Sequence, residues 1–140
     1  MLTSGCDVVE QPLSGSVLIV DDDRGCGRSL AVLIRHLGHK ADYVDSGGQA
    51  LQYLHDRTPD LVILDVMMPE IDGLEVLRRM REDPKTAQVP VVMFSAMADP
   101  TFRESVCRRG ANDYWVKATL DFDSLESRLE RYLPTDQLQN

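Results

Sequence analysis

The chain has 140 residues, of which 43% are hydrophobic and 27% are charged, as in one ordinary globular domain. Its net charge of −8 argues against sequence-independent binding to DNA or RNA, which needs a basic surface. No apolar run approaches the roughly 18 residues that span a membrane, and the N-terminus lacks the basic start and apolar core of a signal peptide.

The cysteines and histidines indicate a reducing compartment and no metal site of their own. Cys6, Cys26 and Cys107 are odd in number and lack CxxC spacing, which predicts free thiols in the cytoplasm. The histidines form no metal-ligand pattern with them and are predicted to lie on the surface.

The start of the chain predicts an extension and then a strand–helix unit. Residues 1–14 are polar and predict a flexible extension. The apolar run 17–20 predicts a buried strand, which meets three consecutive aspartates and then a Gly-Cys-Gly sequence that predicts a turn. A helix follows and ends at Gly38. Its predicted apolar stripe consists of Leu30, Leu33, Ile34 and Leu37.

The middle of the chain predicts two more units of the same kind. The run 41–44 predicts a strand, and a helix follows it. The run 61–64 predicts a strand that ends at Asp65, and the next helix lies between Asp72 and Pro84. The apolar stripes of these two helices consist of Ala50, Leu51 and Leu54, and of Leu74, Leu77 and Met80.

Two further units complete the pattern. The run 91–94 predicts a strand that ends at Ser95, followed by a less hydrophobic helix over about 100–109. The run 113–116 predicts a strand that ends at Lys117, and a last helix follows. The apolar stripe of that helix consists of Phe122, Leu125, Leu129 and Tyr132.

Together the five units predict one α/β domain over residues 15–133, followed by a short tail at 134–140. Each apolar run is too short for a helix and is bounded by polar or turn residues, as in buried parallel strands. The alternation predicts a parallel sheet with helices on both faces. In such a sheet ligands bind beyond the carboxyl ends of the strands, so the residues there are candidates for a site.

Polar side chains of complementary charge close four of the strands. They are Asp21, Asp22 and Asp23 after the first strand, Asp65 after the third, Ser95 after the fourth and Lys117 after the fifth. Any one of them alone would be interpreted as a helix cap, a turn residue or a surface lysine. Because the carboxyl ends of parallel strands meet at one edge, we expect the carboxylates, the hydroxyl and the ammonium group to converge there.

Clustered carboxylates favour a divalent cation over a phosphate cradle. The glycines at 25 and 27 match only part of the GxGxxG pattern, because residue 30 is leucine, and there is no Walker GKS or GKT sequence. Three aspartates also produce negative potential, whereas a phosphate needs positive potential. Hard oxygen ligands predict Mg²⁺, with Mn²⁺ as an alternative, and such a cation can hold a phosphoryl group.

Four motifs resemble those of one family. VLIVDDD at 17–23, LVILDVMMPEIDG at 61–73, VVMFSA at 91–96 and GANDYWVK at 110–117 together resemble the receiver domain of two-component response regulators. The resemblance covers residues 16 to about 133. It implies a flavodoxin-like, doubly wound (βα)5 fold whose five parallel strands have the order 2-1-3-4-5.

The resemblance implies roles for the acidic residues. Asp65 resembles the aspartate that accepts the phosphoryl group. Asp21 and Asp22 resemble the acidic pair that positions Mg²⁺, together with Asp65 and the backbone carbonyl of Met67. A carboxylate is a poor nucleophile toward an anionic phosphoryl group, and Mg²⁺ and Lys117 would cancel that repulsion.

The resemblance also implies a conformational switch. Ser95 matches the residue whose hydroxyl moves to contact the phosphoryl group, and Lys117 matches the lysine that pairs with it. Tyr114 matches the aromatic residue that rotates inward into the space left by Ser95. Ala118 departs from the family, which usually has proline there, often after a cis bond. Because a cis bond to a non-proline costs about 3 kcal/mol, we predict a trans Lys117–Ala118 bond.

The implied function is that of a phospho-accepting switch rather than an enzyme. The donor would be the phosphohistidine of a sensor histidine kinase or of a histidine phosphotransfer protein. The output partner is not specified by the sequence. We expect a monomer, or a weak dimer through the fourth helix, fifth strand and fifth helix, with no nucleic acid or membrane as a partner.

Two alternatives were weighed against this function. A phosphatase or phosphotransferase of the haloacid dehalogenase type would need a second acid two residues after Asp65, where Met67 stands. The second alternative keeps the receiver but places it in a multidomain regulator or hybrid kinase instead of a stand-alone regulator. Because the sequence ends soon after the last predicted helix, no output domain is expected within it.

Two methionines are candidates for controlling the lifetime of the phosphorylated state. Met67 and Met97 occupy family positions two residues after the phospho-acceptor and two after Ser95. Their flexible apolar side chains could lie over the phosphoryl group, and they offer no strong hydrogen bond to an attacking water. Slow hydrolysis is therefore predicted. In the alternative arrangement both side chains simply point to solvent.

Overall fold

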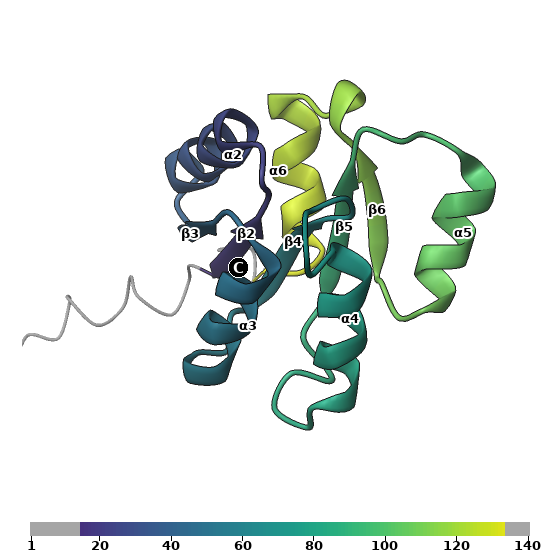
Figure 1. Ribbon diagram of the computed structural model, residues 1–140. Coiled ribbons are helices and arrows are strands. Elements are labelled where there is room, and N and C mark those ends of the chain that lie inside the picture. Colours follow the sequence, from purple (N-terminus) through teal and green to yellow (C-terminus); the bar gives the residue numbers. More distant parts are fainter. Residues whose placement is uncertain (1–14, 134–140) are drawn as a thin grey trace, which may run out of the picture.

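The computed structural model describes residues 15–133, so the predicted extension 1–14 and tail 134–140 lie outside the described residues. Its strands form one parallel sheet in the order β3-β2-β4-β5-β6, which is 2-1-3-4-5 when counted along the chain (Figure 1). The strands are β2 (Ser16–Val20), β3 (Lys40–Val44), β4 (Leu61–Asp65), β5 (Val91–Ser95) and β6 (Asp113–Val116). The predicted fold class and strand order are confirmed.

Helices cover both faces of this sheet (Figure 1). One face carries α2 (Arg24–His36) and α6 (Phe122–Glu130), and the other carries α3 (Gly47–Asp56), α4 (Gly73–Glu82) and α5 (Pro100–Arg108). A short 3-10 turn, η2 (Lys117–Thr119), joins β6 to α6. Among residues 15–133, no helix is long and apolar enough to cross a membrane.

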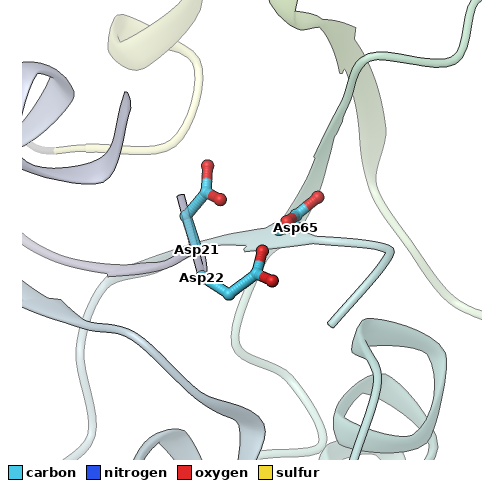
Figure 2. Close-up of side chains that lie close together, drawn as sticks. All are labelled: Asp21, Asp22 and Asp65. Atoms are coloured by element: carbon cyan, nitrogen blue, oxygen red, sulfur yellow. The ribbon is translucent and has the colours of Figure 1, made fainter. Parts of the chain in front are cut away.

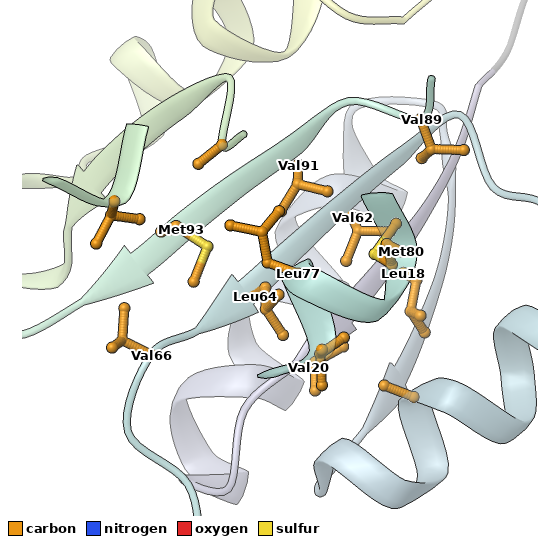
Figure 3. Close-up of a cluster of buried hydrophobic side chains, with 14 of the residues drawn as sticks. Leu18, Val20, Val62, Leu64, Val66, Leu77, Met80, Val89, Val91 and Met93 are labelled. Carbon is orange, nitrogen blue, oxygen red and sulfur yellow. The ribbon is translucent and has the colours of Figure 1, made fainter. Parts of the chain in front are cut away.

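The central strands are buried on both faces, which explains their continuous apolar sequences. Every residue of β4 and of β5 is buried. Alternate side chains point to opposite faces, so Leu18 and Leu64 pack toward α3 and α4 (Figure 3), whereas Ile19 and Ile63 pack toward α2 and α6. By contrast, α5 buries a single residue, Val106.

Each α-helix begins at a side chain that accepts a backbone N–H of the first turn. These N-cap residues are Asp23, Ser46, Asp72, Asp99 and Asp121. The caps follow the strands closely, so the chain turns back along the sheet just beyond its carboxyl edge. Asp23 is thereby engaged as a cap, with its Oδ1 accepting the Cys26 N–H at 3.1 Å.

Three local predictions are corrected. The Gly-Cys-Gly sequence was predicted as a turn, but it lies in the first turn of α2, because the Asp23 cap starts helical geometry at Arg24. The apolar face of α2 also differs from the prediction at one position. Leu33 was predicted to be buried but is exposed, and Ala31 is buried instead. Phe122, predicted to lie in the apolar stripe of the last helix, is exposed at the first position of α6. Its ring centroid lies 6.1 Å from that of His36.

One arginine joins three segments on the α4 side of the sheet. The guanidinium of Arg81, near the end of α4, donates to backbone carbonyls and to one amide oxygen. Its acceptors are the carbonyls of Thr86, Ala87, Val89 and Gly110 and the Oδ1 of Asn112, at 2.9–3.3 Å. Arg81 thus links α4, the loop before β5 and the start of β6.

Replacing Arg81 with Met should therefore destabilise the fold. Methionine keeps the apolar part of the arginine side chain, but several partly buried carbonyls would lose a charged hydrogen-bond donor. This loss should lower the free energy of unfolding by about 3 kcal/mol. Urea unfolding measures the difference. Arg108→Met is the matched control, because Arg108 makes only an exposed ion pair with Glu104 and should cost less than about 0.5 kcal/mol. Equal losses in the two variants would contradict the linking role of Arg81.

Candidate functional site

Three carboxylates meet at the carboxyl edge of the sheet (Figure 2). Strands β2 and β4 are neighbours, with Val20 paired to Leu64, so Asp21 and Asp65 follow paired residues on adjacent strands. Asp22 extends from the start of the loop toward α2. One oxygen from each carboxylate lies within 4.8 Å of the others. The parallel register alone therefore brings these acids together.

The two acids that follow the strands are almost completely buried. Asp21 is 0% exposed and Asp65 is 5% exposed, whereas Asp22 is open to solvent. The Oδ1 of Asp21 accepts the Asp23 N–H at 2.9 Å. Its Oδ2 is buried and forms an ion pair with the Lys117 Nζ at 2.8 Å. The Lys117 Nζ also lies 3.8 Å from the Asp65 Oδ2, so it faces both buried carboxylates.

The site holds more negative charge than Lys117 can neutralise. Burial, and then the charge of Asp21, raise the pKa of Asp65 from its ordinary 3.8 to about 7, although Lys117 acts in the opposite direction. Burial lowers the pKa of Lys117, but contact with Asp21 and the charge of Asp65 outweigh it, so that pKa is raised. Three clustered carboxylates that share one lysine keep a net negative charge, and their oxygens fit the all-oxygen ligand set that Mg²⁺ prefers.

The start of α4 packs closely against the backbone that follows Asp65. The Gly73 N–H donates to the Val66 carbonyl at 2.9 Å. A Cβ at Gly73 would lie only 2.0 Å from the Asp65 carbonyl oxygen, so glycine is needed for this approach. Met67 lies between β4 and α4, and its side chain is 66% exposed. Met67 therefore faces solvent, which is the alternative to a side chain that lies over the phosphoryl group. Met97 is less exposed, at 39%.

Ser95 and Tyr114 meet at one residue of the loop after β5. The buried Ser95 accepts the Met97 N–H on its Oγ at 3.1 Å. The Tyr114 hydroxyl donates to the Met97 carbonyl at 2.8 Å. Tyr114 is 1% exposed, in the inward orientation, and its ring meets Phe102 of α5 edge-on at 6.1 Å. Met97 therefore connects the edge of the site to α5.

The structure thus places the predicted residues around one edge. Asp21, Asp22, Asp65 and Lys117 form a single cluster, and Ser95 closes the strand next to Asp65. The described residues contain no cis peptide bond, so the Lys117–Ala118 bond is trans, as predicted. Sequence reasoning missed Tyr43, whose hydroxyl reaches the Asp21 carbonyl, because the contact depends on how β3 lies beside β2.

Comparison with known proteins gives consistent matches. The family model of the response regulator receiver domain matches residues 17–130. A gliding motility regulatory protein of Myxococcus xanthus is 32% identical over 82% of this chain and 15% of its own length. The phosphate regulon transcriptional regulatory protein PhoB of Rhizobium meliloti is 35% identical over 72% of this chain and 44% of its own length. The chain thus spans less than half of the length of these curated relatives.

Solved structures match over most of their length. The signal receiver domain of a signal transduction histidine kinase from Syntrophus aciditrophicus is 29% identical, with a TM-score of 0.76 over 85% of this chain and 89% of that one. The receiver domain of a Pseudomonas aeruginosa sensor histidine kinase, with a magnesium ion coordinated in its active site cleft, is 26% identical. Its TM-score is 0.77 over 85% of this chain and 97% of that one.

The raised pKa of Asp65 predicts how stability depends on pH without divalent cations. Because the folded pKa exceeds the unfolded one, the destabilisation by Asp65 is fully present above about pH 7 and disappears as the pH falls toward about 4. Asp65→Asn should therefore be more stable than wild type in EDTA at about pH 8, and the gap should close on acidification. Urea unfolding across this pH range measures it.

Asp56→Asn serves as the control, because Asp56 is an exposed carboxylate at the end of α3, away from the cluster. It should change the free energy of unfolding little at any pH. A gap between wild type and Asp65→Asn that stays constant with pH would contradict the assigned pKa shift.

Proposed function

The chain belongs to the receiver domains of response regulators, the signalling switches of two-component systems, and we propose that Asp65 is its phospho-acceptor. The phosphoryl donor would be the phosphohistidine of a sensor histidine kinase or of a histidine phosphotransfer protein. The observation that carries the proposal is the buried acidic cluster facing Lys117 at the carboxyl edge of the sheet. A haloacid dehalogenase-type enzyme is set aside, because the family match covers residues 17–130.

The proposed cation is Mg²⁺, held by the carboxylates of Asp21, Asp22 and Asp65 and by the backbone carbonyl of Met67. Support comes from the excess negative charge of the cluster and from the magnesium-containing receiver domain of Pseudomonas aeruginosa. No comparable observation supports the alternative, Mn²⁺. When bound, the cation would neutralise charge on the carboxylates and on the phosphoryl oxygens.

In the proposed transfer, a carboxylate oxygen of Asp65 forms the new bond to phosphorus as the phosphorus–nitrogen bond to the donor imidazole breaks. The electron pair of that bond returns to the imidazole nitrogen. Lys117, whose Nζ lies between Asp21 and Asp65, is placed to turn its ammonium group toward the transferred phosphoryl oxygens. Asp65 must be ionised to attack, so neutralisation of its neighbours favours the reaction.

The proposed switch acts through Met97. Movement of the Ser95 hydroxyl to donate to a phosphoryl oxygen would stretch the bond that its Oγ accepts from the Met97 N–H. Because Tyr114 already lies inward and holds the Met97 carbonyl, the change would pass to α5 by this shared residue. Moving such an equilibrium from 1:99 to 99:1 needs about 5.5 kcal/mol.

The output face proposed for this switch comprises α5, β6 and α6, with a protein partner, another domain or a second copy of the chain in a weak dimer. We propose residues 15–133 as the receiver domain, acting in the cytoplasm. Since the chain spans less than half of the length of the Myxococcus xanthus and Rhizobium meliloti relatives, the output can reside in another protein or in another part of a longer chain.

Phosphorylation itself provides the central test. With Mg²⁺ and acetyl phosphate, the protein should gain one phosphoryl group that is acid-stable and base-labile, seen by intact mass spectrometry. Asp65→Asn should abolish the gain and EDTA should suppress it. Asp23→Asn is the matched control, because Asp23 caps α2 beside the cluster and should leave labelling intact. Undiminished labelling of Asp65→Asn would remove the proposal.

The two methionines give a prediction about signal lifetime. Neither side chain can orient an attacking water strongly, whether it covers the phosphoryl group or points to solvent. Met67→Asn with Met97→Glu should therefore speed loss of the phosphoryl group by about tenfold, equivalent to about 1.4 kcal/mol of barrier. Met67→Leu with Met97→Leu should keep the slow rate. Equal phosphate-release rates in wild type and the polar double variant would contradict it.

A further inference from the structure

The backbone of Asp21 is anchored to the edge strand β3. The paired register of β2 and β3 ends at Val20 and Val44, one residue before Asp21. The Asp21 N–H donates to the Val44 carbonyl at 3.2 Å. On its other side, the Asp21 carbonyl accepts the hydroxyl of Tyr43 at 2.6 Å. Both backbone polar groups of this buried aspartate are therefore held by neighbouring residues of one strand.

The tyrosine reaches this carbonyl by passing directly under α2. A Cβ on Gly27 would lie 2.1 Å from the Cε1 of the Tyr43 ring, so only glycine leaves room for the ring at this point. Glycine inside a helix is unfavourable relative to alanine. The ring thus explains a residue that otherwise weakens α2, and Gly27 and Tyr43 form a matched pair.

An ion pair near the surface also joins α2 to the end of β3. The Arg24 guanidinium, in the first turn of α2, lies 3.0 Å from the Asp45 carboxylate, which follows β3. This pair is largely exposed and contributes little by itself. The hydroxyl of Tyr43 differs, because it bonds a residue whose carboxylate belongs to the buried cluster.

We propose that Tyr43 is a positioning residue for the cation site, acting through the Asp21 backbone. Asp21 carries one of the three clustered carboxylates, and fixing its peptide groups fixes the direction of its side chain toward Asp65. Partners that orient metal ligands typically change metal affinity by about 10- to 100-fold when they are removed. The inference rests on the proposed Mg²⁺ site and adds a residue from the edge strand to it.

Isothermal titration of the full chain with MgCl₂ tests the role without phosphorylation. Tyr43→Phe keeps the ring and removes only the hydroxyl, and it should weaken Mg²⁺ binding by about tenfold. Tyr53→Phe is the matched control, because the Tyr53 hydroxyl also donates to an aspartate, the Oδ2 of Asp42 at 2.8 Å, away from the cluster. Its Mg²⁺ affinity should equal that of wild type.

A second pair of variants tests whether the Tyr43 ring needs the space beside Gly27. Gly27→Ala should push the Tyr43 ring away and weaken Mg²⁺ binding like Tyr43→Phe. Gly25→Ala, in the same helix, is the control, because a Cβ there meets only the Asp23 Oδ1 at an ordinary 3.6 Å. It should leave the affinity unchanged.

The outcomes separate this inference from the proposed function. Failure of wild type to bind Mg²⁺ would overturn the cation site and the role of Tyr43 together. If wild type binds Mg²⁺ and Tyr43→Phe matches it, only the positioning role is overturned. Equal weakening in Tyr43→Phe and Tyr53→Phe, or wild-type affinity in Gly27→Ala, would overturn it as well.

Discussion

Crowded negative charge at the carboxyl edge of the sheet is the constraint on which the rest of the structure depends. Asp21 and Asp65 are buried side by side because their strands are neighbours, and the Lys117 ammonium lies close to both. Like charges in a poorly solvated space destabilise the fold, as the raised pKa of Asp65 indicates. The same crowded negative charge is what the proposed divalent cation would neutralise.

The residues around this edge fall into two groups, one next to the carboxylates and one that joins the edge to α5. On the β2 and β4 side, the Tyr43 hydroxyl binds the Asp21 carbonyl, and the Gly73 N–H binds the carbonyl of Val66, the residue after Asp65. On the β5 side, the connection to α5 passes through the backbone of Met97. Carboxylates that are to bind a cation must stay in place, whereas the residues of the proposed switch must be able to move. The contacts of the carboxylates and those of Met97 lie on different strands.

Sequence patterns predicted the strands, the sheet and the clustered residues, because parallel strands with polar residues after them must bring those residues to one edge. They failed where the answer depends on packing between elements. The helical start of α2 at Arg24 was missed because the glycines at 25 and 27 were interpreted as a turn, whereas the Asp23 cap starts a helix there. The contact of Tyr43 with Asp21 requires the alignment of two strands, and the inward position of Tyr114 is a choice of rotamer.

The sparse burial of α5 has a consequence for how the molecule opens. With only Val106 buried, this helix contributes little to the core, whereas every residue of β4 and β5 is enclosed. Local unfolding costs least where few apolar contacts are lost. Backbone amides of α5 would therefore exchange with deuterium through small openings that leave the sheet intact, while those of the central strands would exchange only with global unfolding. The helix of the proposed output face is thus also one that can be reshaped without disturbing the acidic cluster.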